Sequence, residues 1–125
     1  RAADPDDKLD QITVVDDQLG RLTFTRDMAQ AIFHVLGTHA PYGTYGCTGS
    51  GAVKSWADIA RAVFEAANGN GEKVAPVSTT DYYASAEGPI APRPVHSALD
   101  LSRLESTGFR MPDWEEELGE YLKTL

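Results

Sequence analysis

The sequence is poor in cysteine and in net positive charge, and it has no long apolar run. Cys47 is the only cysteine among 125 residues, so the chain can form neither an internal disulfide nor a thiolate metal cluster. The net charge of -8 argues against nonspecific nucleic-acid binding, because phosphates require a basic surface. No apolar run approaches the roughly 20 residues that cross a bilayer, and the N-terminus lacks the apolar region of a signal peptide. We therefore expect a cytoplasmic protein with no membrane or nucleic-acid partner and with Cys47 as a small core residue.

Motifs for phosphate binding and proton transfer are also missing. Residues 46–55, GCTGSGAVKS, resemble a phosphate-binding loop, but two residues separate Gly51 from Lys54, whereas the lysine of such a loop follows the last glycine directly. The dinucleotide fingerprint G-x-G-x-x-G would place its third glycine at Lys54. No tyrosine is followed four residues later by lysine, the pair that transfers a proton in short-chain dehydrogenases. We predict no cofactor-binding or catalytic residue here, and favour a strand-to-helix connection capped by Ser55.

Metal-binding patterns are equally weak. The three histidines are too scattered for an H-E-x-x-H site, and His34 falls beside the apolar stripe of a predicted helix, so packing or surface roles are favoured for them. Aspartates between residues 1 and 10 loosely suggest a calcium loop, but Leu9 stands where that loop requires glycine. We predict no metal site. The polar, acidic residues 1–10 are predicted to be a flexible lead-in, followed by a single domain over residues 11–125.

Short β-branched segments alternate with amphipathic segments, which predicts an α/β fold with three main helices. The helices are expected at 25–36, 55–67 and 113–122, with Thr25 and Ser55 as N-caps of the first two. Strands are expected at 11–15, 42–48, 74–78 and 97–100, and a single helical turn at 102–104. Trp56 and Trp114 each head the apolar stripe of a helix, so both are predicted to be core anchors.

Residues 81–94 show neither helical nor strand periodicity, which predicts a long loop of the kind that often carries function. Arg93 stands between Pro92 and Pro94, where the backbone is locally stiff. A guanidinium held there could grip a diphosphate through two parallel hydrogen bonds. The alternative is an ordinary surface arginine.

Four segments carry a recognisable pattern: residues 14–20 (VVDDQLG), 55–60 (SWADIA), 91–94 (APRP) and 97–100 (SALD), the last followed by Leu104. Together they resemble the C-terminal half of the dTDP-4-dehydrorhamnose reductases, members of the extended short-chain dehydrogenase family. Their order and spacing match that family from residue 11 to residue 122. One departure is Leu22, where the family usually has proline before a threonine equivalent to Thr23.

The resemblance implies a parent enzyme that reduces dTDP-4-dehydro-L-rhamnose with NADPH to dTDP-L-rhamnose for polysaccharide biosynthesis. It also implies that the cofactor and the catalytic residues belong to an N-terminal Rossmann domain that this chain lacks, so the chain alone is expected to be inactive. Its implied contribution is a substrate-binding domain that covers the dTDP-sugar, with Arg93 contacting the diphosphate and with Asp17 and Gln18 near the cleft. Strands that would join the missing domain could expose edges and favour self-association. The alternative is a non-catalytic binding module, like the regulatory subunit of methionine adenosyltransferase.

Overall fold

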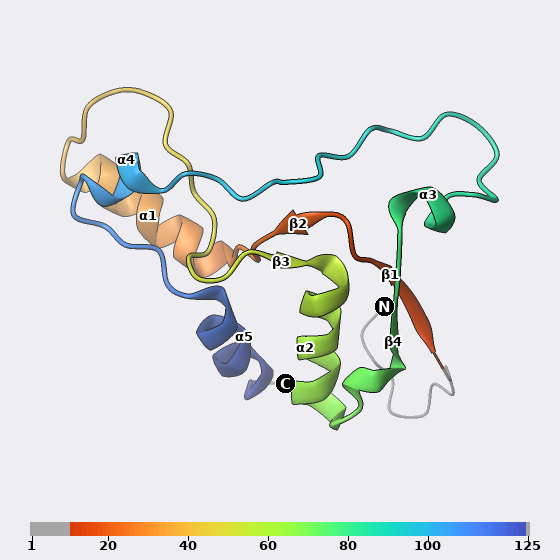
Figure 1. Ribbon diagram of the computed structural model, residues 1–125. Helices are drawn as coiled ribbons and strands as arrows, with labels where there is room; N and C mark the ends of the chain where they lie inside the picture. The colour runs from red at the N-terminus through yellow and green to blue at the C-terminus, as the bar shows by residue number, and fades with distance from the viewer. Residues whose placement is uncertain (1–10, 125) are drawn as a thin grey trace. The chain divides into compact units, whose positions relative to one another are not determined.

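The computed structural model describes residues 11–124, and Figure 1 traces their order along the chain. They fall into two compact units, each built from two separate stretches of sequence. The first unit combines the residues up to Gly20 with Lys54–His96, and the second combines Arg21–Val53 with Ser97–Leu125. The predicted lead-in at residues 1–10 lies outside the described residues. The predicted α/β class is confirmed, with three main helices and a few short strands.

The first unit is built around a parallel pair of strands. Strand β1 (Ile12–Val15) pairs with β4 (Val74–Val77), with Ile12 opposite Val74 and Val15 opposite Val77. Helix α2 (Trp56–Asn68) lies between them in sequence and packs along both strands, as Figure 1 shows. A second, antiparallel pair joins β2 (Leu19–Gly20) to β3 (Lys54–Ser55) and brings the start of α2 next to the start of β2. A short 3-10 turn, η1 (Gly71–Lys73), and helix α3 (Thr79–Tyr82) precede and follow β4.

Helix α2 begins and ends where the sequence predicts. The Ser55 hydroxyl accepts a hydrogen bond from the Asp58 backbone N–H and donates one to the Asp58 carboxylate, which is a variant of the capping box. The helix ends at Gly69, whose φ of 64° lies in the left-handed region that glycine adopts without penalty. Ala57 and Ile59 are buried residues of this helix.

The second unit has its own core. It contains α1 (Thr25–Gly37), α4 (Ser102–Glu105) and α5 (Trp114–Leu122). Helix α5 begins at Asp113, whose carboxylate caps the Glu115 N–H. The buried cluster comprises Ala31, Leu101, Leu104 and Met111, with Val35, Tyr45, Cys47 and Phe109 packed against it. The indole of Trp114 is fully buried and donates a hydrogen bond to the Ala52 carbonyl at 2.7 Å.

The strands predicted at 42–48 and 97–100 are wrong. Residues 42–48 form a bend at Tyr42 and Gly43 and no strand, and Gly46 lies so close to another segment that an added Cβ would be 2.3 Å from the Asp100 carbonyl oxygen. Asp100 instead accepts hydrogen bonds from the Ser102 N–H and hydroxyl at the start of α4. Side-chain capping and close approach occupy the positions where the sequence predicted a strand ladder.

Three smaller expectations also differ from the structure. Thr25 is the first residue of α1 rather than its N-cap, which is Phe24 without a side-chain bond. The predicted loop at 81–94 begins inside α3. Trp56 is 43% exposed, so its predicted role as a core anchor is wrong, whereas Trp114, at 0% exposed, confirms the same prediction. Trp56 is the first residue of its helix. A helical side chain leans over the turn that precedes it, and no helical turn precedes Trp56.

Candidate functional site

The three predicted substrate-contacting residues lie on two segments of the first unit that are bonded to each other. Asp17 and Gln18 lie between β1 and β2, whereas Arg93 lies near the end of the long loop. The Leu19 N–H donates to the Val95 carbonyl at 2.8 Å, and a parallel bridge links Leu19 to His96. The loop therefore returns beside β2. Arg93 lies two residues before Val95, and Gln18 lies one residue before Leu19.

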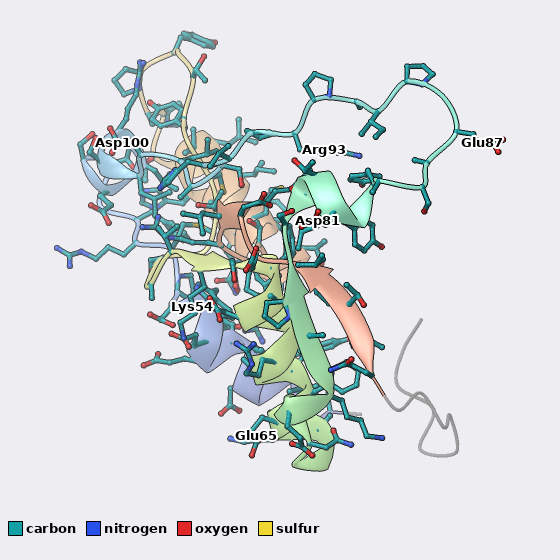
Figure 2. The ribbon with its side chains drawn as sticks, turned by 45° about the vertical axis from the view of Figure 1, so that its right-hand side comes forward. Lys54, Glu65, Asp81, Glu87, Arg93 and Asp100 are labelled. Atoms are coloured by element: carbon teal, nitrogen blue, oxygen red, sulfur yellow. The ribbon has the colours of Figure 1, made fainter. Side chains whose placement is uncertain are left out.

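Arg93 is exposed on the extended stretch that returns from the region of Glu87, as Figure 2 shows. Its neighbours Pro92 and Pro94 have fixed φ angles, which limit the backbone freedom of this stretch. Among residues 11–124, no acidic side chain pairs with its guanidinium. Its guanidinium carries five N–H donors, enough to bind two oxygens of a ligand at once.

Asp17 is bonded to the first residue of α3. Its carboxylate accepts one hydrogen bond from the Thr79 backbone N–H at 2.9 Å and another from the Thr79 hydroxyl. These bonds, the hydroxyl bond foremost, hold the pKa of Asp17 below its ordinary value. Asp17 therefore ties the end of β1 to the start of α3, across 62 residues of sequence.

Gln18 is held through both its side chain and its backbone. Its Nε2 donates to the Thr79 hydroxyl oxygen at 2.9 Å, and its carbonyl accepts the Trp56 N–H at 3.2 Å where α2 begins. Thr79 is thus the shared partner of Asp17 and Gln18, and the sequence did not reveal it. The signal available in the sequence was the capping box of Ser78 and Asp81, which predicts a helix start but not the partners of Thr79.

The glycine-rich residues 46–51 do not cradle a phosphate. A Cβ at Gly49 would lie 2.4 Å from the Leu22 carbonyl oxygen, and one at Gly51 would lie 2.1 Å from the Asp113 carboxylate. Gly51 also has a φ of 94°, which glycine tolerates best. Glycine is required at both positions because protein atoms approach the backbone too closely for a side chain. The Asp113 carboxylate next to Gly51 would also repel a bound anion. This segment therefore does not fit the phosphates of a dinucleotide.

Titratable groups of the second unit have structural partners. The His34 ring nitrogen Nε2 lies 2.9 Å from the Thr107 carbonyl oxygen, and the ring packs against Phe109, which confirms the predicted packing role. Cys47 is half-buried against the core, where burial and, to a lesser extent, Asp27 raise its thiol pKa.

Within residues 11–124 there is no group of three or more His, Cys, Asp or Glu that could hold a metal ion. No helix in that range is both long and apolar enough to span a membrane.

Comparison with known proteins gives a consistent result. A spore coat polysaccharide biosynthesis protein, SpsK, of Bacillus subtilis is 35% identical over 90% of this chain. A dTDP-4-dehydrorhamnose reductase of Aggregatibacter actinomycetemcomitans is 32% identical over 87% of it. The crystal structure of a dTDP-4-dehydrorhamnose reductase from Clostridium acetobutylicum matches with a TM-score of 0.79, at 34% identity over 92% of this chain. That of the Bacillus anthracis reductase, in complex with NADP, matches with a TM-score of 0.75, at 32% identity over 93%.

The chain spans between 37% and 39% of the length of these four proteins. Residues 4–125 match the family described as the RmlD substrate binding domain. Because this match covers nearly the whole chain, the chain belongs to the RmlD substrate binding domain family.

Proposed function

We propose that this chain is the sugar-nucleotide-binding portion of an NADPH-dependent dTDP-4-dehydrorhamnose reductase of dTDP-L-rhamnose biosynthesis. The observation that carries the proposal is the family match over residues 4–125, together with relatives of that name and activity at 32% to 35% identity. A nucleotide-binding Rossmann domain N-terminal to this chain supplies the cofactor site and the proton donor. The chain alone is then not catalytic, because it has no Tyr-x-x-x-Lys pair and its glycine-rich segment faces protein atoms.

Within this proposal, Arg93 contacts the diphosphate of the substrate, and Asp17 and Gln18 lie at the edge of the same cleft. The support is geometric. The backbone bond between Leu19 and Val95 places the two segments next to each other, and Arg93 has its guanidinium free of acidic partners among the described residues. A guanidinium matches two phosphate oxygens at once, which an ammonium cannot do.

A related keto-sugar nucleotide is the second candidate substrate. A relative in Streptomyces antibioticus, named as a probable dTDP-4,6-dihydroxy-2-methyloxan-3-one 4-ketoreductase, is 32% identical over 87% of this chain. That identity equals the value for the Aggregatibacter reductase, so the match itself does not rank the two sugars. Both candidates share the dTDP group and a reaction at the 4-keto carbon. Their test is therefore a comparison of sugars on the same nucleotide.

The experiment is to express the parent protein and follow NADPH oxidation with each keto sugar. Turnover with dTDP-4-dehydro-L-rhamnose at a higher kcat/KM than with the alternative sugar is the expected result. The chain 1–125 assayed alone should show none. A parent protein that carries no Tyr-x-x-x-Lys pair and oxidises NADPH with neither sugar would contradict the proposal and favour the non-catalytic binding module.

Arg93→Ala in the parent protein tests the diphosphate contact. Losing a charge-assisted, bidentate contact is worth roughly 1.5 to 3 kcal/mol, which is about a tenfold to hundredfold rise in substrate KM. The KM for NADPH should not change, and Arg93→Lys should recover only part of the loss because it keeps the charge but not the planar geometry. Arg110→Ala removes another exposed arginine and is the matched control. Unchanged substrate KM and kcat in a folded Arg93→Ala protein would return Arg93 to the role of a surface arginine.

The two-stranded sheet of β1 and β4 offers a surface to which another domain could bind. Among the described residues β1 and β4 pair only with each other, so each strand has a further edge for a neighbour. We propose that the missing Rossmann domain is the natural partner, and that the isolated chain self-associates when it is absent. A concentration-dependent mass by light scattering would support this, and a monomer at high concentration would not. The cytoplasmic location stays a prediction.

A further inference from the structure

The hydrogen bonds around Thr79 have a fixed direction. A carboxylate can only accept, and the lowered pKa keeps Asp17 deprotonated near neutral pH. One oxygen of Asp17 accepts the Thr79 backbone N–H and the other accepts the Thr79 hydroxyl proton. A threonine hydroxyl has a single proton. Because that proton is directed at Asp17, the Thr79 oxygen can only accept from any further partner.

The further partner is the side-chain amide of Gln18, which lies 2.9 Å from the Thr79 hydroxyl oxygen. It must present its NH₂ group to Thr79, since a carbonyl there would face a lone pair. We propose that Asp17 and Thr79 are positioning residues that fix the orientation of the Gln18 amide, so that its Oε1 is presented as an acceptor to a neutral donor of the sugar nucleotide. The donor is a sugar hydroxyl or the imide N–H of thymine. This inference rests on the proposed function.

The backbone around Gln18 supports the same role. Its carbonyl is bonded to the start of α2, and the next residue, Leu19, is bonded to the returning loop through Val95. Gln18 is therefore held on the helix side, on the loop side and at its amide. Gln18 also directly precedes Leu19, which is bonded to the segment that carries Arg93. A cation for the diphosphate and an oriented acceptor for a neutral donor together match the two chemical parts of a nucleoside diphosphate sugar.

Asp17→Asn reverses the direction of the hydrogen bonds that join residue 17, Thr79 and Gln18, with almost no change in the shape of the side chain. The carbonyl oxygen of the introduced asparagine accepts the Thr79 backbone N–H, and its NH₂ then donates to the Thr79 hydroxyl oxygen. The hydroxyl proton is released toward Gln18, whose amide turns over and presents NH₂ instead of Oε1. A donor facing the ligand's donor leaves both unsatisfied, so we expect substrate KM in the parent protein to rise by about tenfold. The KM for NADPH should stay unchanged and kcat should fall less than KM rises.

The double variant Asp17→Asn/Gln18→Glu separates positioning from simple capping of α3. In this variant the Thr79 hydroxyl donates to one oxygen of the introduced glutamate, and the second oxygen again offers an acceptor to the ligand. The double variant also conserves the net charge. We expect it to recover most of the lost affinity, whereas a purely structural role of Asp17 predicts no recovery. Thr79→Ser, which keeps the hydroxyl, should behave like the wild type, and Thr79→Val should raise substrate KM.

Two further measurements make the outcomes distinct. Inhibition by dTDP identifies the donor, because weaker inhibition in Asp17→Asn assigns thymine, and unchanged inhibition with raised substrate KM assigns the sugar. Solvent exchange of the Gln18 amide protons, measured by NMR, should be slow in the wild type and fast in Asp17→Asn. A parent protein inactive with every dTDP keto sugar refutes the proposed function, whether or not the exchange rates change. An active parent whose Asp17→Asn variant keeps its substrate KM, or whose double variant recovers nothing, overturns the positioning role.

Discussion

The two tryptophans should differ sharply in their contribution to stability, although the sequence places both at the head of an apolar stripe. Trp114 is 0% exposed, and its indole N–H is bonded to the Ala52 carbonyl. Replacing a buried tryptophan with alanine removes its transfer free energy and leaves a cavity, at a cost of about 3 to 5 kcal/mol. Since whole domains are stable by about 5 to 15 kcal/mol, Trp114→Ala should remove roughly a fifth or more of that stability. Trp56 is 43% exposed, and Trp56→Ala should cost under about 1.5 kcal/mol.

Urea unfolding of the chain, followed by circular dichroism, measures this difference. With a slope of about 2 kcal/mol/M, Trp114→Ala should lower the unfolding midpoint by about 1.5 to 2.5 M, and Trp56→Ala by well under 1 M. Trp114→Phe is the informative control. It keeps most of the ring volume but leaves the Ala52 carbonyl without its donor, which should cost about 1 to 3 kcal/mol. If Trp56→Ala lowered the midpoint as much as Trp114→Ala, the burial argument would be refuted.

Two further predictions concern capping and acidity. Ser55→Ala removes the acceptor for the Asp58 N–H and should destabilise the chain by about 0.5 to 2 kcal/mol in urea unfolding, whereas Ser55→Thr, which keeps a hydroxyl, should recover most of that loss. The folded-state pKa of Asp17 is lowered, so its bonds to Thr79 stabilise the fold above the unfolded pKa of about 3.9 and lose this effect as the pH falls through the folded value. The midpoint difference between wild type and Asp17→Asn should therefore be largest near neutral pH and vanish in strong acid. A difference independent of pH would contradict the assignment.

Local signals predicted the helices well, because the interactions that start and stop a helix are close in sequence. Ser55, Asp58 and Gly69 give α2 a cap, a capping box and a left-handed end within a single segment. Asp113 does the same for the start of α5. The strands predicted at 42–48 and 97–100 are wrong because a strand needs a partner, and the sequence of one short segment does not show whether a partner is available.

Asp17, Gln18 and Arg93 were predicted as substrate contacts through a family resemblance, whereas the tertiary structure decided which protein groups they contact. Nothing near Asp17 or Gln18 in sequence points to Thr79, which is 62 and 61 residues away, respectively. The same holds for Arg93, which is placed beside β2 by the backbone bond from Leu19 to Val95.

The sequence by itself determined the α/β class, the three main helices and the lack of a dinucleotide fingerprint, since each depends on composition or on spacing within one segment. Only the tertiary structure decided which tryptophan is buried and which hydroxyl joins Asp17 to Gln18. Burial and long-range hydrogen bonding depend on which segments meet in space, and a periodic pattern in one segment does not identify the segment that will cover it.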